Sequence, residues 1–491
     1  MEFSGLLFVC GMLPLIILGY FLIPDMAGKN KYLIAVSLIL IGLSQIIYLP
    51  LIVGITYLTY RMSLKIRRGK MATVIVPAAF NLGSLLVLKY LDPILVQFGL
   101  FADKGGLLVG FASEAIYRIN GLGMNLNIPE SVAPLGFSFY ILSSLSYILD
   151  VYKGKYPAEK KFGNLLLYFV MFSKYFQGPL VRYDQMRGQI LPRRVSFHRC
   201  LEGAARFATG LGKKAILADY CGVYLLELAS SKSDQALVGS WIAAILFFFR
   251  IYFDFSGCCD MANGLANIFG FRFPENFKKP YMAISVTEFW ERWNITLRGF
   301  FVDYVHAPLA GEKKDGLRGF LALLVAVLLY SLWHGATFNF VIFGLYYLII
   351  LLIEKKFQYF LSDLPDWLRH IQTKLCIIVG WVIFRFTDMG TLANAVKAMI
   401  GEGGFSVVDD SIRFWSVLPL FAVCSIGVSR LPDKMRRFWR TFCGIGNRER
   451  GSDRMELLYL LSCFAYILLI LRLFVMVRTN IPVQPSVFLN L

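Results

Sequence analysis

The chain has 491 residues, 57% of them apolar, and its 50 Lys and Arg exceed its 32 Asp and Glu by enough to give a formal net charge of +18. This composition excludes a series of water-soluble domains and favours one polytopic membrane domain. The basic residues lie in short segments between apolar runs, as in cytoplasmic loops, so we expect contact with membrane lipids and no nucleic-acid partner.

The first part of the chain predicts a series of apolar helices. Residues 5–24 form a first span that is retained, because neither a basic leader nor a small-residue cleavage site accompanies them. Residues 32–60 are longer than one hydrocarbon thickness of about 30 Å and contain Pro50, so they predict two spans or a kinked pair. Residues 72–100 form a further span, and we expect a loop with an interfacial helix over 101–130.

The middle of the chain alternates between apolar and broken segments. Short apolar helices are expected over 131–152 and 163–177, and spans over 215–230 and 236–256. Residues 257–316 contain no clean apolar run of about 20 residues, so they predict short helices broken by Gly, Pro and charge. Irregular backbone at membrane depth is tolerated only where protein or a water-filled cavity covers it, as in a buried active site.

The last part of the chain returns to apolar helices, which brings the expected total to about eleven spans. These spans are 317–335, 337–353, 372–387, 413–429 and 456–477. Lys and Arg are concentrated in three segments, and the preference of basic loops for the inner side predicts that all three face the cytoplasm. The three segments are 61–70, 182–214 and 430–454.

The sequence carries no signature of a resident cofactor. The nine cysteines form no C-x-x-C pair and many lie in apolar runs, so we expect reduced packing residues and no metal site. No P-loop, dinucleotide fingerprint or Gly-x-Ser-x-Gly elbow is found. We therefore expect no tightly bound cofactor.

Several polar side chains lie where a membrane makes them costly, within the segment 252–347. A buried polar group needs a partner or a purpose, and an ionisable one inside a membrane is a functional hypothesis by default. These side chains are Asp254, Asp260, Asn263, Asn294 and His334.

His334 is one of only four histidines and ends a long apolar run in YSLWHGATF. An imidazole with an unperturbed pKa of about 6.5 can serve as a general base at neutral pH, and desolvation favours its neutral, proton-accepting form. The alternative is a core histidine with a hydrogen-bond partner. The residues alone leave both readings open.

Five motif blocks occur in one order along the chain, between residues 136 and 347. They are GFSFYILSSLSYILDVYKG (136–154), FQGPLVRYDQM (176–186), YFDFSGCCDMANGLANIFGFRFPENF (252–277), PYMAISVTEFWERWNITLRGFFVDYVHAPLAG (280–311) and SLWHGATFNFVIFGLYY (331–347). This order resembles the membrane-bound O-acyltransferase family, in particular its bacterial branch with the alginate O-acetyltransferase membrane subunit. It is similar, more weakly, to the D-alanyl transfer protein of teichoic acid modification.

The resemblance implies an all-α, polytopic fold and one integral membrane acyltransferase domain over 1–491, with its core motif region at 252–347. It also implies that His334 is the catalytic histidine, which accepts the proton of the attacking hydroxyl. Trp333 would then form a wide wall, and Gly335 would allow a close backbone approach.

Asn294, in RWNITLRGF, departs from the bacterial branch, where this place is usually a histidine, although many eukaryotic members carry asparagine. An amide is no base near neutral pH, but it can donate a hydrogen bond to a developing oxyanion or orient the substrate. A structural role is the alternative. His306, in DYVHAPLAG, stands where relatives tend to carry an aromatic; it is either a substitute for the missing histidine or a loop residue.

Asp254 and Asp260 are six residues apart and do not share one helical face cleanly. Paired carboxylates could act as acid and base or bind a cation. We instead expect ion pairs with arginines nearby in the sequence, namely Arg250, Arg272 or Arg292.

The charged residues of 288–298 are expected to pair along one amphipathic helix. This helix would place Trp290 and Trp293 at the membrane surface or at the mouth of a tunnel. Cationic residues near that mouth, such as Arg292, could receive the phosphates of a coenzyme A donor.

The resemblance implies a membrane O-acyltransferase of the bacterial cytoplasmic membrane. Its donor would be acetyl-CoA or another acyl thioester on the cytoplasmic side. Its acceptor would lie outside, where a secreted or membrane-anchored acetyltransferase partner would complete O-acetylation of a cell-surface polysaccharide, as in alginate or other exopolysaccharide biosynthesis. Which polysaccharide is modified is not written in the sequence.

Three alternatives remain open. D-alanyl transfer to teichoic acid belongs to the same family, although ATFNFVIFGL after WHG and FGFRFPENF favour the alginate branch. A non-enzymatic transporter or flippase predicts repeated halves with matching interrupted helices, whereas the broken region here is single. A pseudoenzyme scaffold is suggested by Asn294.

Overall fold

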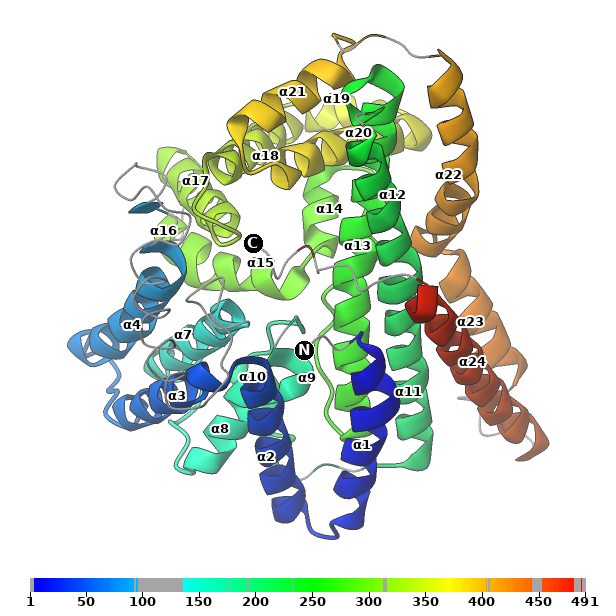
Figure 1. Ribbon diagram of the computed structural model, residues 1–491. Coiled ribbons are helices and arrows are strands. Elements are labelled where there is room, and N and C mark those ends of the chain that lie inside the picture. The colour runs from blue at the N-terminus through cyan, green and yellow to red at the C-terminus, as the bar shows by residue number, and fades with distance from the viewer. Residues whose placement is uncertain are drawn as a thin grey trace, which may run out of the picture. The chain divides into compact units, whose positions relative to one another are not determined.

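The computed structural model describes residues 4–91, 94–95, 136–175, 177–191, 193, 195–231, 233–311, 316–402, 404, 407–443, 453–480 and 487. Every regular element within them is a helix (Figure 1), so the all-α prediction is confirmed. The loop expected at 101–130 lies outside these residues.

The contacts divide the chain into two compact units. Unit 1 contains Leu15–Pro192 and Leu332–Thr337, and unit 2 contains Glu2–Pro14, Arg193–Ser331 and Phe338–Leu491. The single domain expected over 1–491 stays a prediction.

Unit 1 is built from the N-terminal helices and the short helices that precede residue 192. Its elements are α1 (Leu13–Leu22, from Leu15 on), α2 (Met26–Gln45), η2 (Ile46–Tyr48), α3 (Leu49–Ser63), α4 (Ala72–Leu85), η3 (Leu86–Tyr90), α7 (Phe137–Lys153), α8 (Phe162–Val170), α9 (Phe172–Tyr175) and α10 (Tyr183–Arg187).

Local signals set the boundaries of the first helices of unit 1. The Asp25 carboxylate accepts the Gly28 N–H at 2.6 Å and so caps the start of α2. The break expected in 32–60 is confirmed, because α2 passes into the 3₁₀ turn η2 before α3 begins. Pro50 lies in the first turn of α3, where its missing N–H costs no hydrogen bond.

Unit 2 holds the remaining helices. They are η1 (Leu7–Met12), α11 (Phe197–Leu211), η4 (Gly212–Ala218), α12 (Asp219–Ser230), η5 (Ser233–Gln235), α13 (Leu237–Ile268), η6 (Pro280–Met282), α14 (Val286–Arg292), α15 (Ile295–Phe301), η7 (Val302–His306), α16 (Ala307–Ala310), α17 (Leu317–Leu332, to Ser331), α18 (Phe338–Lys356), α19 (Gln358–Asp363), α20 (Asp366–Arg385), α21 (Met389–Met399), α22 (Val407–Val428), α23 (Leu431–Phe442) and α24 (Asp453–Asn480).

The helix α13 corrects one prediction about where the chain breaks. The sequence indicated short helices from Gly257 onward, yet α13 continues to Ile268, beside α11 (Figure 1). A Cβ at Gly257 would lie 2.8 Å from the Gly210 carbonyl oxygen, and one at Gly264 would lie 2.6 Å from the Gly203 carbonyl oxygen. These glycines therefore allow two helix backbones to approach closely, as small residues do at helix crossings in membranes. The broken helices expected further on are confirmed at α14, α15, η7 and α16.

Two of the basic segments expected to be loops are largely helical. Residues 182–214 contain α10, α11 and the start of η4, and 430–442 forms α23. Basic composition reports the side of the membrane and not backbone conformation, so the sequence argument had no information on this point. The cytoplasmic orientation of these segments stays a prediction.

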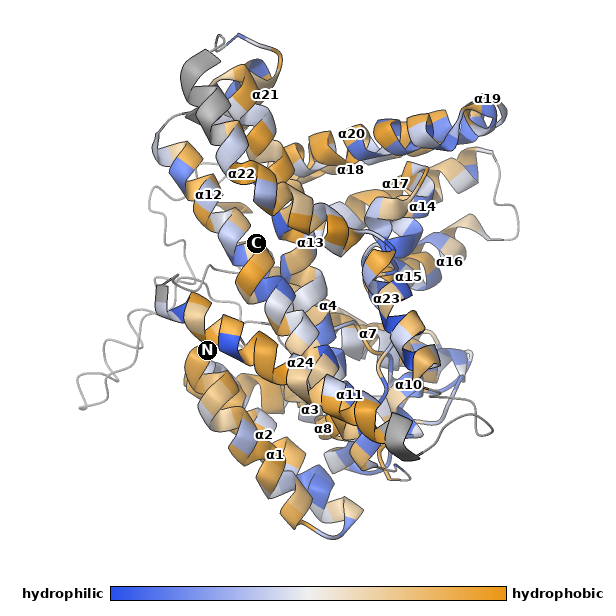
Figure 2. Cartoon of the chain, turned by 90° about the vertical axis from the view of Figure 1, so that its right-hand side faces the viewer, coloured by the Kyte–Doolittle hydropathy of each residue, from blue (hydrophilic) through white to orange (hydrophobic). Residues whose placement is uncertain are grey.

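Within the described residues, five helices are long and apolar enough to cross a membrane, and the bent pair α22 and α23, at 55°, makes a sixth if it forms one span. The five are Met26–Ser44, Ala72–Tyr90, Leu237–Ile268, Phe338–Lys356 and Leu457–Thr479. Figure 2 shows the hydrophobic colour along α24, which is typical of a lipid-facing helix. The polytopic fold is thus confirmed, while the count of about eleven spans stays a prediction, because shorter apolar helices such as Leu317–Leu332 do not meet the length criterion.

Candidate active site

The WHG motif forms a tight turn in unit 1. The turn follows α17, and the Gly335 N–H donates to the Leu332 carbonyl at 3.1 Å, which closes it. His334 is only 7% exposed. The structure therefore places the imidazole in a buried position at a helix end, as the apolar run predicted.

Two side chains of η3, Lys89 and Tyr90, donate hydrogen bonds to this turn. The sequence analysis did not single them out. Lys89 Nζ donates to the Trp333 carbonyl at 2.9 Å, and the Tyr90 hydroxyl donates to the same oxygen at 3.1 Å. The Trp333 ring meets Phe139 edge-on, with centroids 6.0 Å apart. Lys89 could have been noticed as a lone cation in an apolar span, since such residues are rare and usually have a function.

The environment of His334 favours the neutral imidazole. Burial, first, and the neighbouring Lys89 ammonium, second, lower the pKa of His334, which lies in a turn outside the candidate spans. A neutral imidazole can accept a proton, so the electrostatics fit a general base.

Asn294 lies at the break between α14 and α15 in unit 2 and is 1% exposed. Its backbone is left-handed, with φ 44° and ψ 50°. Asn and His are among the few non-glycine residues that tolerate this conformation. This backbone gives a structural reason for the asparagine and for the histidine expected there from the family resemblance.

The side chain of Asn294 is not used to cap the helix that it precedes. Asn276 does so instead, because its Oδ1 accepts the Thr296 N–H at 3.1 Å and the Thr296 hydroxyl at 2.8 Å. The Asn294 amide lies beside the Tyr330 hydroxyl, yet within the described residues Asn294 Oδ1 has no hydrogen-bond partner of normal geometry. A buried amide left in this state costs roughly 1–3 kcal/mol, which makes it a candidate ligand-binding group.

Trp293 lies inside unit 2, which corrects the prediction that it faces the membrane surface or a tunnel mouth, whereas for the partly exposed Trp290 that position stays a prediction. Trp293 is fully buried, with its ring centroid 4.8 Å from Trp381 and 5.0 Å from Phe277. Trp290 is half-buried, and its ring centroid lies 4.9 Å from that of Tyr347. The helix break turns Trp293 inward, which a continuous amphipathic helix would not do.

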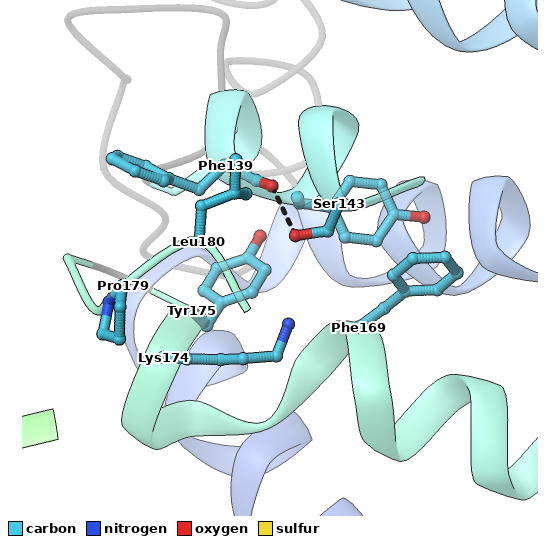
Figure 3. A pocket seen from close by; sticks show the side chains of 8 residues that line it. Phe139, Ser143, Phe169, Lys174, Tyr175, Pro179 and Leu180 are labelled. Atoms are coloured by element: carbon cyan, nitrogen blue, oxygen red, sulfur yellow. Dashed lines mark hydrogen bonds between the residues drawn. The ribbon is translucent and has the colours of Figure 1, made fainter. Parts of the chain in front are cut away.

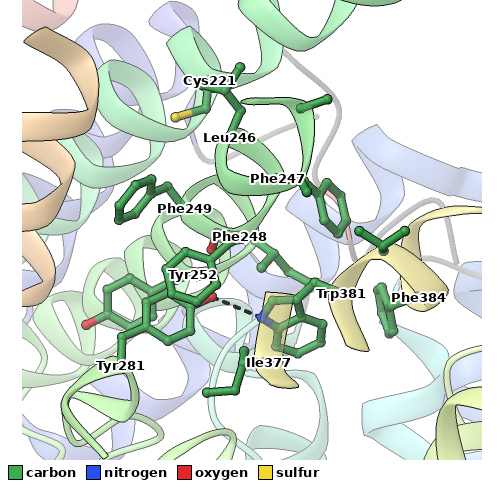
Figure 4. Close-up of a cluster of buried hydrophobic side chains, with 14 of the residues drawn as sticks. Cys221, Leu246, Phe247, Phe248, Phe249, Tyr252, Tyr281, Ile377, Trp381 and Phe384 are labelled. Atoms are coloured by element: carbon green, nitrogen blue, oxygen red, sulfur yellow. Dashed lines mark hydrogen bonds between the residues drawn. The ribbon is translucent and has the colours of Figure 1, made fainter. Parts of the chain in front are cut away.

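Both rings belong to an aromatic core around α13. Figure 4 shows Tyr252 and Phe248 of α13 beside Tyr281, and the Trp381 Nε1–H donates to the Tyr281 hydroxyl at 3.1 Å. Aromatic pairs of this kind add about 0.5–1.5 kcal/mol each beyond their buried area. This core fixes the α14–α15 break, and with it Asn294.

The charged residues of 288–298 form ion pairs as expected, but not along one helix, because the chain breaks between α14 and α15. Arg292 forms an i,i+4 ion pair with Glu288, and Arg298 lies 4.0 Å from Glu291 across the helix break. Arg292 is about three-quarters buried. Its proposed contact with donor phosphates stays a prediction.

Asp254 and Asp260 form ion pairs, but not with the arginines expected. Asp254 lies 2.8 Å from Lys214, and Asp260 lies 2.7 Å from Lys213 and 3.0 Å from Arg206. The partners come from α11 and η4, which the glycine contacts bring against α13. Sequence proximity could not reveal them, because the packing of two helices decides which cations are near.

The other histidines lie in ordinary surroundings. His306 ends η7 and is partly exposed. His198 pairs with Glu202 at 3.5 Å, and His370 Nδ1 lies 3.0 Å from the Ala283 carbonyl. The structure thus groups Trp333, His334 and Gly335 in unit 1, and Trp290, Trp293 and Asn294 in unit 2. A buried imidazole that can accept a proton and a buried amide that can donate a hydrogen bond are the kinds of group that acyl transfer to a hydroxyl requires.

Comparison with known proteins agrees with this chemistry. The sequence model of the membrane-bound O-acyltransferase (MBOAT) family matches residues 159–387. The chain is 31% identical over 416 residues to the probable alginate O-acetylase of Pseudomonas putida, covering 83% of this chain and 82% of that protein. It is 27% identical over 446 residues to the peptidoglycan O-acetyltransferase of Helicobacter pylori, covering 82% and 81%.

A weaker similarity links the chain to the teichoic acid D-alanyltransferase of Bacillus subtilis, at 23% identity over 236 residues, or 46% of this chain and 59% of that protein. These similarities confirm the sequence-based prediction of an acyltransferase. The chain belongs to the membrane-bound O-acyltransferase family.

Proposed function

We propose that this enzyme moves an acetyl group from acetyl-CoA on the cytoplasmic side of the bacterial cytoplasmic membrane toward a cell-surface polysaccharide. The observation that carries the proposal is the buried, neutral His334, held in its turn by Lys89 and Tyr90. The relatives that match most of this chain are named for O-acetylation of alginate and of peptidoglycan.

In the proposed reaction a hydroxyl oxygen attacks the thioester carbonyl carbon while His334 takes the hydroxyl proton. The family resemblance, and not the placement of the two units, predicts the Asn294 amide as the donor to the carbonyl oxygen when it becomes an oxyanion. Collapse of the tetrahedral intermediate breaks the carbon–sulfur bond, and the proton held by His334 passes to the leaving thiolate. Removing one oxyanion donor costs about 10²–10³ in turnover elsewhere, and a general base contributes roughly 10²–10⁴.

D-alanyl transfer is the second candidate, and its support is smaller. The two teichoic acid D-alanyltransferase matches cover 46% and 52% of this chain, whereas the O-acetyltransferase matches cover more than four-fifths. Supplying a D-alanyl carrier-protein thioester in place of acetyl-CoA distinguishes the two donors directly.

The proposal includes an orientation and a partner. Segments 61–70, 182–214 and 430–454 would face the cytoplasm, and a secreted or membrane-anchored acetyltransferase would complete the transfer outside. Single-cysteine labelling of these segments with an impermeant reagent tests the orientation. Labelling of all three from outside intact cells would contradict it.

The central test uses membrane vesicles that carry the protein, with radiolabelled acetyl-CoA on the cytoplasmic side. His334→Ala should abolish acetyl transfer while the purified protein stays monodisperse. His198→Ala is the matched control, because it removes a partly exposed histidine of α11 and should leave transfer unchanged. Normal transfer by a folded His334→Ala variant would refute the enzymatic role of this turn.

A further inference from the structure

Lys174, in unit 1, is a buried ammonium that the proposed reaction does not use. The chain turns at Met171 between α8 and α9, which brings Lys174 inward until it is 5% exposed. Within the described residues the structure gives its Nζ no carboxylate partner, and its recorded contact is the Tyr168 ring, 4.2 Å from the ring centroid. An isolated buried ammonium costs several kcal/mol, and one aromatic face offsets only part of it.

A small cavity lies beside this ammonium. It is lined by Phe139, Tyr140, Ser143, Phe169, Lys174, Tyr175, Pro179 and Leu180. Figure 3 shows the Lys174 side chain reaching toward the space that Phe169, Tyr175 and Ser143 surround. The cavity volume is about 10 Å³, enough for one water molecule or one oxygen of a larger group.

The chemistry of the lining favours an anionic oxygen. The Ser143 hydroxyl already donates to the Phe139 carbonyl at 2.8 Å, and the Tyr140 hydroxyl is engaged with Thr56 at 3.0 Å. None of the eight lining residues is acidic. Lys174 is therefore the charged donor that lines the cavity, and in the described part of the chain no anion receives it.

Among the described residues no ion pair reaches Lys174. The Asp150 carboxylate is paired with Lys155 at 3.0 Å. The backbones at Lys174 and Gly178 approach closely, since a Cβ at Gly178 would lie 2.5 Å from Lys174 Cα. Lys174 is the charged residue that lines the cavity.

The cavity is one side chain away from the WHG turn. Phe139 lines the cavity, and its ring meets Trp333 edge-on, with the ring centroids 6.0 Å apart. A group bound on Lys174 would therefore lie near the turn that carries His334.

We propose that Lys174 and this cavity form a subsite for one oxygen of a carboxylate. The use of the site rests on the proposed acyl transfer, but the binding does not. Two sources supply this chemistry: the carboxylate of an acidic sugar in the acceptor, and acetate released by hydrolysis of the donor.

Binding is tested on purified full-length protein in detergent, by thermal unfolding with sodium acetate or sodium glucuronate against sodium chloride at equal ionic strength. The carboxylates should raise the unfolding temperature of the wild type above the chloride reference. Lys174→Met should weaken this binding by about 10- to 100-fold, since a hydrogen bond to a charged group contributes roughly 1.5–3 kcal/mol. Lys174→Arg keeps the charge and should retain part of the shift.

The outcomes are separable. An equal shift in Lys174→Met, or no excess over chloride in the wild type, overturns the subsite. A larger response to glucuronate indicates the acceptor as the source, and a larger response to acetate indicates the hydrolysis product. His334→Ala should keep the shift while losing acetyl transfer. If the wild type itself shows no acetyl transfer but the carboxylate shift is present, the proposed function fails and the subsite stands.

Discussion

The cations Lys214 of unit 2 and Lys174 of unit 1 are buried to nearly the same degree, with exposures of 3% and 5%, yet their surroundings differ. Lys214 lies 3.1 Å from Asp219 and 2.8 Å from Asp254, and Asp219 also receives Arg478 at 2.8 Å. Lys174 has an aromatic face and a cavity. Charges that are fully paired tie helices together, whereas an unpaired buried group is costly unless a ligand completes it.

The largest effect should come from breaking the paired network. Lys214→Met leaves Asp219 and Asp254 without their shared cation, so we expect a loss of about 3–5 kcal/mol of stability, as for other buried pairs with one partner removed. Size-exclusion profiles and unfolding temperatures in detergent measure this loss. A variant as stable as wild type would show that the network is not a structural tie.

The next effect concerns Asn294, whose Oδ1 has no hydrogen-bond partner among the described residues. Asn294→Gly removes the amide but keeps the left-handed backbone, so the protein should fold while turnover falls by about 10²–10³. Asn294→Ala is the control for the backbone, because it should lose a further 1–2 kcal/mol or so of stability. Normal turnover by the glycine variant would assign Asn294 to structure and direct attention to His306.

A smaller effect is expected at the adjacent residue Lys213, which belongs to a separate ion-pair cluster with Asp260 and Arg206. Lys213 is 22% exposed at its side chain, and its partner Asp260 keeps Arg206 when Lys213 is lost. Lys213→Met should therefore cost only about 1 kcal/mol. Comparing its unfolding temperature with that of Lys214→Met tests whether a carboxylate with a second cation, Asp260, tolerates the loss of one lysine better than Asp254 does. Equal losses of stability would contradict this difference.

The smallest effect is a pH dependence at Lys174. Burial lowers the pKa of Lys174 from its ordinary value of 10.5 to about 7, so between these values the unfolded chain binds one proton more than the folded protein. Stability should then rise with pH, by about 1 kcal/mol from pH 7.5 to 8.5. Lys174→Met should lack this rise and, at neutral pH, be as stable as wild type or more so. The same slope in both proteins would contradict an unpaired ammonium.

Much of the fold was predictable, because hydropathy reports burial in lipid and caps report helix ends. Residue type alone indicated three features: the break between α2 and α3 just before Pro50, the short helices after residue 280, and the all-α class. The break at Gly257 was predicted wrongly, because glycine interrupts a helix in isolation but permits a close crossing when another helix supplies the packing.

The candidate site likewise has features that the sequence determined and features that only the structure decided. The sequence by itself determined that His334, Asn294, Asp254 and Asp260 are polar groups in apolar surroundings, because their cost follows from composition. Only the tertiary structure decided that both aspartates are paired by Lys213 and Lys214, that Asn276 frees the Asn294 amide, and that Lys89 and Tyr90 hold the WHG turn. Partners of this kind are distant in sequence, and a residue's neighbours along the chain do not report which side chain a neighbouring helix will place within hydrogen-bond distance.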